Sequence, residues 1–351
     1  MHYTATQRVN TRAERDNKNA MQYRRSDYDV TNTVQVSSAV AVRRAVEELY
    51  TRTWPGGPVD RLGMAFTDFE RLFGGQFPGY LGCDTVYHDV QHSLDDTLAM
   101  ARLLVGYERS HAPDQRFGAE RALLGLVVAL FHDAGYIRQT DDTKHRNGAE
   151  FTRTHVGRSA QFLARYLPTI GMAEWVPVAT QIVHFTGYEL RFDQIRLDDV
   201  RDRKVGHLMG TADMTAQMAD RCYLEKCRDR LYPEFVLGGI AVANGEQGLK
   251  VTYGSGLDVL RQTPEFVAET IRTRLDGEFG GAYRYFEVVF GGRNPYMEAI
   301  EGNLGYLRQV LQTKRWSMLR RVPPCFTWEK NPLQNMRALV IDHLTATVSA
   351  A

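Results

Sequence analysis

Apolar residues recur along this 351-residue chain at intervals of three and four positions, which places them on one face of a helix. The first clear stretch begins at Val36 and is broken at Pro55–Pro58. Another carries Leu94, Leu98, Ala101 and Leu104. Alternating runs long enough for a sheet are absent, and the Gly-containing segment 244–256 reads as a loop. The pattern therefore predicts an all-α fold.

The same pattern suggests three parts. Residues 1–35 are polar, rich in Arg and Asn and nearly free of large aliphatic side chains. Such a segment buries too little apolar surface to order itself, so we expect a flexible N-terminal arm. Residues 36–235 should form the main helical domain, and residues 236–351 a C-terminal helical extension packed on it.

Charge and cysteine content narrow the class of protein. The chain has 43 Lys and Arg against 42 Asp and Glu, a net charge of +1, so no basic field suggests nucleic-acid binding. Its 4 cysteines form no C-x-x-C pair and read as reduced thiols. No apolar run approaches the ~20 residues of a membrane span, and no signal-peptide core follows Met1. We therefore expect a cytoplasmic protein without a membrane partner.

The most informative motif is the adjacent pair His132-Asp133, which stands in the apolar stretch Ala129–Tyr136. Burying two such polar side chains costs several kcal/mol unless a partner satisfies them. A divalent cation would do so, because the pair offers one nitrogen and one oxygen ligand. The motif therefore suggests a buried metal site.

Other histidines and one aspartate strengthen this hypothesis. His88 and His92 are four apart on an expected helix, capped by Asp84 or Thr85, and so share one side of it. Asp95 shares that side and could accept the ring proton of a metal-bound His92. Further candidates on expected helices are His155, His184 and Asp213.

The order His, His-Asp, His, His, Asp resembles the HD-domain superfamily of metal-dependent phosphohydrolases over about residues 80–235. In addition, Tyr87-His88-Asp89-x-x-His92-Ser93-x-Asp95 is similar to the Tyr-His-Asn-x-x-His-Ala-x-Asp motif of cyclic-nucleotide phosphodiesterases. The resemblance implies an HD-type, phosphodiesterase-like helical bundle with additional C-terminal helices.

The resemblance also implies roles for individual residues. One metal would be held by His92, His132, Asp133 and Asp213. Asp133, the central catalytic carboxylate, would bridge to a second metal that is also held by His155 and His184, and His88 would act as the general acid. The implied cofactors are two divalent transition-metal ions (Fe, Mn, Zn, Co or Ni, with Mg an option at the second site).

Some neighbouring residues have open roles. His145 competes with His155 for the second metal. Lys144 and Arg158 are candidates to contact a substrate phosphate, and Gln217, four residues past Asp213, shares its helix face. The aromatic residues between Tyr283 and Tyr306 suit the core better than a pocket wall or a homodimer face.

We therefore expect a hydrolase that acts on a small-molecule phosphate ester or diester, with a nucleotide as first choice. Two alternatives stay open at this point. The same ligands resemble those of HD-type mixed-valent di-iron oxygenases, and a regulatory nucleotide-binding module could retain its metals without turnover. His88 argues against the oxygenase, because oxidation needs no acid for a leaving group.

Overall fold

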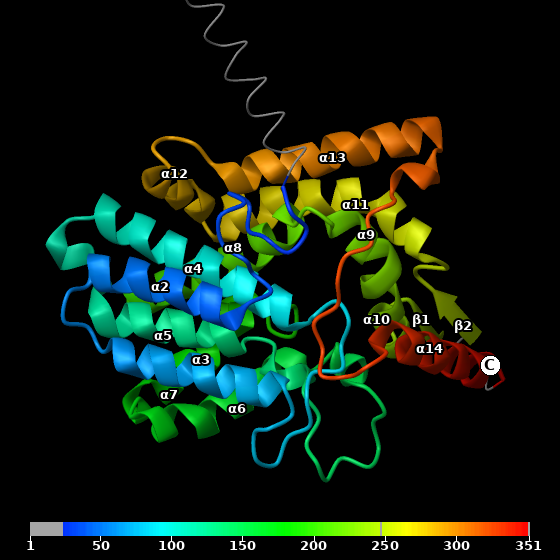
Figure 1. Ribbon diagram of the computed structural model, residues 1–351, viewed down its shortest axis with the longest axis horizontal. Coiled ribbons are helices and arrows are strands. Elements are labelled where there is room, and N and C mark those ends of the chain that lie inside the picture. The colour runs from blue at the N-terminus through cyan, green and yellow to red at the C-terminus, as the bar shows by residue number, and fades with distance from the viewer. Residues whose placement is uncertain (1–23, 246–247, 350–351) are drawn as a thin grey trace, which may run out of the picture.

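Helices form nearly all of the regular structure in the computed structural model, which describes residues 24–245 and 248–349 (Figure 1). In the first part of the chain they are α2 (Ala39–Thr53), α3 (Val59–Phe73), α4 (Val90–Ser110), α5 (Gly118–Phe131), α6 (His155–Tyr166), α7 (Val176–Ile182) and α8 (Val200–Ala219). The later ones are α9 (Tyr223–Lys226), α10 (Tyr232–Leu237), α11 (Gly256–Thr270), α12 (Tyr285–Val289), α13 (Pro295–Thr313) and α14 (Pro332–Ser349). The predicted all-α class is confirmed.

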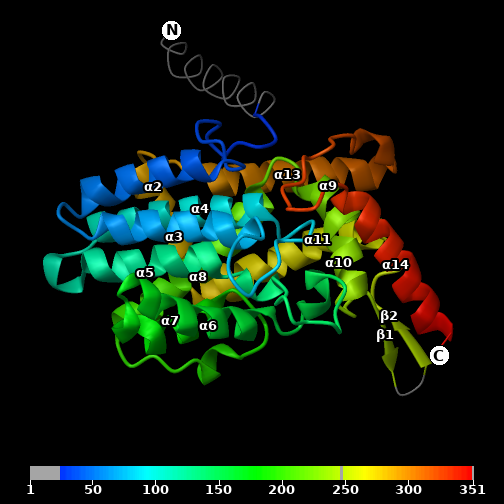
Figure 2. The same cartoon turned by 60° about the horizontal axis from the view of Figure 1, so that its bottom comes forward.

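Helix α4 lies at the centre of this arrangement. Nearly all of its residues are buried, because α2, α5, α8 and α12 pack around it. Helices α2, α3, α4 and α5 run side by side, and α8 packs across α4 and α5 (Figures 1 and 2). The apolar side chains of these helices form one continuous core with those of α11 and α13.

The start of α4 differs from the prediction. The helix is capped by Asp89, whose carboxylate accepts the backbone N–H groups of Gln91 and His92, and not by Asp84 or Thr85. Thr85 instead donates its hydroxyl to the His88 carbonyl, which closes a turn before the helix. His88 therefore lies in this turn, while His92 lies in the first helical turn.

A short hairpin occupies part of the segment that reads as a loop. Strand β1 (Val242–Gly245) pairs antiparallel with β2 (Gly248–Val251). Four residues per strand are too few for an alternating pattern to stand out, and Gly248 takes the positive φ of 103° that the turn requires. Helix α14 packs on α10 and β1 near the C-terminal end (Figure 2).

The predicted N-terminal arm is folded from Arg24 onward, and residues 1–23 lie outside the described part of the chain. Asp29 is fully buried and accepts hydrogen bonds from the amides of Thr33 and Val34. It also forms an ion pair of 2.6 Å with Arg102 of α4. Paired polar groups, together with Val30 and Val34 packed against the core, hold residues 24–35 on the helices, so the prediction of a flexible segment is wrong for these residues.

The C-terminal helices pack on the earlier ones: α12 on α4, α13 on α8 and α14 on α10. The expected boundary between residues 235 and 236 falls inside α10, so the two parts share an element. Over residues 24–245 and 248–349, no helix combines the length and apolar character needed to cross a membrane.

Candidate metal centre

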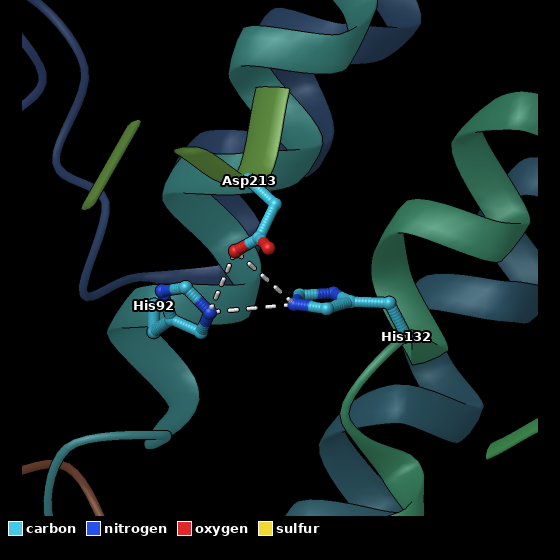
Figure 3. A group of neighbouring side chains, drawn as sticks. All are labelled: His92, His132 and Asp213. Carbon is cyan, nitrogen blue, oxygen red and sulfur yellow. Dashed lines mark hydrogen bonds and ion pairs between the residues drawn. The ribbon is translucent and has the colours of Figure 1, made fainter. Parts of the chain in front are cut away.

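Side chains from three helices converge at the middle of the bundle. Figure 3 shows His92 of α4, His132 at the C-terminal end of α5 and Asp213 of α8 pointing toward one another. His92 Nε2 lies 3.3 Å from His132 Nε2 and 3.4 Å from Asp213 Oδ1. The distance from His132 Nε2 to Asp213 Oδ1 is 3.9 Å. These residues can therefore offer three ligand atoms to one ion.

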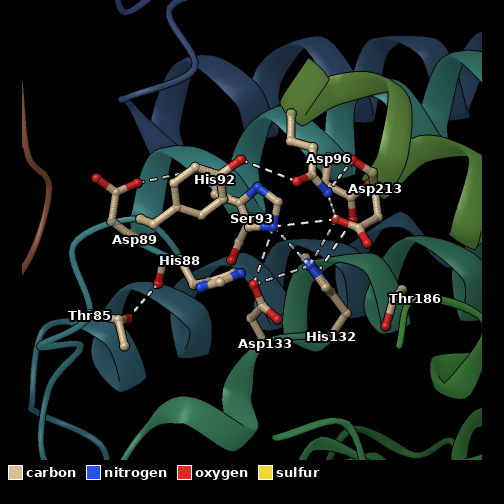
Figure 4. A network of polar contacts seen from close by, with 12 residues as sticks. Thr85, His88, Asp89, His92, Ser93, Asp96, His132, Asp133, Thr186 and Asp213 are labelled. Atoms are coloured by element: carbon tan, nitrogen blue, oxygen red, sulfur yellow. Dashed lines mark hydrogen bonds and ion pairs between the residues drawn. The ribbon is translucent and has the colours of Figure 1, made fainter. Parts of the chain in front are cut away.

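Asp133 supplies a fourth atom. Its Oδ2 lies 3.2 Å from His92 Nε2 and 3.3 Å from His132 Nε2 (Figure 4). Tetrahedral ligands about 2.1 Å from a transition metal would be about 3.4 Å from one another. The five separations that involve His92 or His132, 3.2 to 3.9 Å, fit a cation that these two rings share with the carboxylates.

The hydrogen bonds of the centre also fit a cation. His132 Nδ1 donates to the Ala129 carbonyl at 2.8 Å, which leaves Nε2 as the nitrogen for a metal. Burial lowers the pKa of His132, but the Asp133 and Asp96 charges outweigh this and raise it well above its usual value, so a metal at Nε2 would replace a proton. Asp133 Oδ2 is buried and accepts no hydrogen bond within the described structure. The four side chains are only 1% to 7% exposed. The donor set therefore fits a divalent metal ion.

Burial and neighbouring positive charge shift the pKa values of the two carboxyl groups in opposite directions. Burial raises the pKa of Asp213, and the imidazoles of His132 and His92 only partly offset it. For Asp133, burial acts the same way, but His132 and His92 together hold its pKa well below the usual range. Asp133 is therefore the carboxyl that stays ionised and available to a cation.

His155 extends the centre on the other side of Asp133. Its Nε2 lies 3.8 Å from Asp133 Oδ1, and its Nδ1 donates to the Thr152 carbonyl at 2.9 Å. Burial lowers the pKa of His155 to about 4, so the ring is neutral at pH 7. The two oxygens of Asp133 thus face different imidazoles, as a bridging carboxylate requires.

The competing histidine lies elsewhere. His145 pairs with Asp142 at 2.9 Å and packs on Phe151, with ring centroids 4.4 Å apart. It has no contact with Asp133 within the described residues. Of the two candidates for the second metal, His155 is therefore the one beside the bridging carboxylate.

His184 is not brought into contact with Asp133 or His155 within the described part of the chain. It lies in the single turn Val183–Phe185 that follows α7. Its Nδ1 is buried without a hydrogen-bond partner there, and burial lowers the pKa of the ring. Its role as a metal ligand stays a prediction.

A buried carboxylate that the sequence analysis missed holds His88. Glu234 of α10 is fully buried, and its Oε2 accepts a hydrogen bond of 2.6 Å from His88 Nδ1. Its Oε1 accepts the backbone amides of Val86 and Tyr87 at 2.7 and 2.6 Å. Burial lowers the pKa of His88, but the Glu234 charge outweighs this and the pKa lies above its usual value. His88 is therefore suited to carry a proton near neutral pH.

Asp95 does not take the place expected of it beside a ligand, whereas Gln217 does. Asp96, not Asp95, lies beside a ligating ring, with Oδ2 3.4 Å from His132 Nδ1. Asp95 borders a small cavity with Lys226, and burial raises its pKa to about 7. Gln217 does contact a ligand, because its amide donates to Asp213 Oδ1 at 3.2 Å.

A cavity of about 460 Å³ opens over the centre. His88, His92, Asp133 and His155 line its floor, and its walls are mainly apolar and aromatic. The outer wall includes Tyr188, Leu231, Phe235, Tyr253, Val259 and Phe266. A ligand with an aromatic or apolar body fits such walls.

The expected phosphate contacts lie outside this cavity. Lys144 is exposed on a distant loop, and Arg158 donates to the carbonyls of Gly135 and Ile137. Arg153, which the sequence did not single out, is the Arg or Lys side chain that the described residues place in the lining. Its side chain is exposed, and its guanidinium donates to the Gly239 carbonyl at 2.6 Å.

Comparison of the chain with protein-family models, curated proteins and solved structures found no match. The centre is therefore defined by its own donor atoms. These are two imidazole nitrogens and two carboxylate oxygens, with a third imidazole beyond Asp133. Such a mixed nitrogen and oxygen set suits Fe, Mn, Co, Ni or Zn better than Ca.

Proposed function

We propose that this protein is a metal-dependent phosphohydrolase of the HD-domain type, acting on a nucleotide-like phosphate ester or diester. The observation that carries the proposal is the meeting of the His92 and His155 imidazole nitrogens with the Asp133 carboxylate, next to a histidine suited to hold a proton. One part of the site can thus bind cations, and the adjacent part can supply a proton.

The residues divide between two cation positions. One would be held by His92, His132, Asp133 and Asp213. The other would use Asp133 Oδ1 and His155, joined by His184. Divalent cations in such a pair lower the pKa of water and neutralise charge on the phosphoryl oxygens.

His88 would act as the general acid. Its Nδ1 is committed to Glu234, so the proton to be donated is the one on Nε2. The His88 ring lies beside that of His92, with centroids 5.5 Å apart. It is thus next to the ligand set without belonging to it, as proton transfer to a leaving oxygen requires. This pair favours hydrolysis over the oxygenase alternative.

The cavity suggests what the substrate looks like. Aromatic and apolar walls suit a nucleobase or similar planar group, and they exclude water from the centre. Arg153 at the rim can pair with one phosphoryl charge. A single lining cation favours a mono- or diester over a polyphosphate.

The test combines metal analysis with a substrate panel. Purified protein, loaded with Mn, Fe, Ni, Zn, Co or Mg in turn, is assayed on phosphomonoesters and phosphodiesters. We expect hydrolysis that depends on added metal and is abolished by Asp133→Asn. Asp142→Asn, which alters a carboxylate paired with His145 outside the cavity, is the matched control and should retain activity.

Two results would count against the proposal. One is full activity of the Asp133→Asn variant. The other is iron-dependent O2 consumption with an organic substrate and no phosphate release, which would favour the oxygenase. Metal binding and nucleotide binding without any turnover would favour a regulatory module.

A further inference from the structure

Three aromatic rings pack together beside the proposed metal centre. Tyr136 contacts both His88 and His155, with ring centroids 4.5 Å and 4.3 Å away. The interplanar angle is 18° in both pairs, while the two imidazoles lie 6.2 Å apart at 34° to each other. Tyr136 is only 2% exposed. A single phenol ring thus packs against both the proposed proton donor and the outer ligand.

The backbone around Tyr136 is held by α6, the helix that begins with His155. Arg158 donates to the Gly135 carbonyl at 2.7 Å, and the Ser159 hydroxyl accepts the Gly135 amide at 2.8 Å. A Cβ on Gly135 would lie 1.8 Å from the His155 carbonyl oxygen, so the two segments touch. The Tyr136 ring therefore keeps a fixed position relative to His155.

Among the described residues, each imidazole of this cluster has one hydrogen bond that orients it. His88 is anchored through Nδ1 to Glu234, and His155 through Nδ1 to the Thr152 carbonyl. One such bond fixes a point on the ring but leaves its tilt free. Contact with a flat neighbour restricts that tilt, because offset parallel rings have a preferred geometry. The Tyr136 ring thus helps to aim the two functional nitrogens, both Nε2.

We propose that Tyr136 is a positioning residue that orients both His88 and His155 through contact with its ring. The His88 part rests on the proposed function, whereas the His155 part concerns metal binding alone. The ring, not the hydroxyl, carries the role, so Tyr136→Phe should behave as the unmodified protein. Tyr136→Leu removes the flat surface while keeping an apolar side chain.

The first test is a calorimetric titration of the metal-free protein with Mn²⁺. We expect Tyr136→Leu to weaken one of two binding steps about 10-fold or more, the loss typical when a group that orients a ligand is removed. Tyr136→Phe should stay within about 2-fold of the unmodified protein by the same reasoning. Equal affinities in Tyr136→Leu and the unmodified protein would overturn the His155 part.

The second test separates positioning of the acid from a general structural effect. Bis(p-nitrophenyl) phosphate has a leaving group that needs no proton, whereas an alkyl phosphodiester needs one. A misplaced acid should lower kcat of Tyr136→Leu about 10- to 100-fold on the alkyl ester. On the nitrophenyl ester kcat should change little, and KM should change little on both. Equal losses on both esters would overturn the His88 part.

Controls keep these outcomes distinct. Tyr50→Leu removes a tyrosine that is 1% exposed from α2, which carries no residue of the metal centre, and should leave both readouts unchanged. If Tyr136→Leu loses helical content by circular dichroism, Tyr136→Met is used in its place, because the flexible Met side chain can fill the same space. No hydrolysis of any ester by the unmodified protein would defeat the proposed function and the His88 part, while the Mn²⁺ titration still decides the His155 part.

Discussion

The pair formed by His88 and Glu234 allows the sharpest test of the proposed chemistry. In Glu234→Gln, the remaining carbonyl oxygen can still accept the amides of Val86 and Tyr87, which Glu234 Oε1 accepts now. The other position, which faces His88 Nδ1 at 2.6 Å, changes from a charged acceptor to an amide group. The substitution therefore removes the partner of the imidazolium while keeping the shape of the side chain.

The expected effect follows from that one bond. A hydrogen bond to a charged group is worth about 1.5–3 kcal/mol, or about 10- to 100-fold in an equilibrium. The Glu234 charge raises the pKa of His88 against the effect of burial, so its loss favours the neutral ring. Because the acid must be protonated, activity is lost as pH rises through the His88 pKa, and Glu234→Gln should move that loss to lower pH.

The assay is the pH dependence of kcat on an alkyl phosphodiester and on bis(p-nitrophenyl) phosphate. At pH 8 we expect Glu234→Gln to be about 10- to 100-fold slower on the alkyl ester and nearly unchanged on the nitrophenyl ester. Glu225→Gln, which alters an equally buried carboxylate paired with Arg321, is the matched control. An unaltered pH profile in Glu234→Gln would refute the assignment of His88 as a donor set by Glu234.

Further predictions concern metal loading, acid stability and substrate affinity. Asp133→Asn should leave less than one metal per chain by elemental analysis while circular dichroism shows the helical content unchanged, because the bridging charge is lost. Burial raises the pKa of Asp29, but Arg102 and hydrogen bonds lower it from 3.8 to about 2, which corresponds to about 2 kcal/mol. That stabilisation is present above pH 3.8 and lost as pH falls toward 2. Denaturant unfolding should therefore find Asp29→Asn less stable by at least this amount at pH 6, with the gap narrowing toward pH 3. Arg153→Gln should raise KM about 10-fold at constant kcat, since it removes the positive charge that would pair with a substrate phosphate.

Much of the helical fold could be predicted because periodic apolar residues mark helices that pack on a core. The break at Pro55–Pro58 does separate α2 from α3. Residues 24–35 could not be predicted this way, because their order depends on paired polar groups such as Asp29 with Arg102, 73 positions away. Counting apolar residues along the sequence does not detect such pairs. The hairpin at 242–251 was missed for a different reason, since its strands are too short to show alternation.

The candidate site divides along similar lines. His92, His132, Asp133 and Asp213 could be grouped because the order of histidines and aspartates resembles the HD-domain superfamily, and the structure buries all four side chains. Glu234 could not be added to this group, because it is 146 positions away from His88 in the sequence. The only signal in the sequence was that Glu234 stands in an apolar stretch. Helical spacing also failed to separate Asp95 from Asp96, since positions three and four beyond His92 lie on nearly the same face.

Two local hydrogen bonds bear on the proposed cations. His132 and His155 each donate Nδ1–H to the carbonyl three residues earlier, Ala129 and Thr152, so a metal would bind each ring through Nε2. Without a metal, burial lowers the pKa of His132, but the Asp133 and Asp96 charges outweigh it, so a proton on Nε2 pairs with Asp133 Oδ2 at 3.3 Å. Asp133 Oδ1 then faces His155, whose pKa burial lowers to about 4, so that this ring has no proton on Nε2 to donate. A divalent cation on each side of the carboxylate would satisfy all of these atoms together, which supports the proposed dinuclear site.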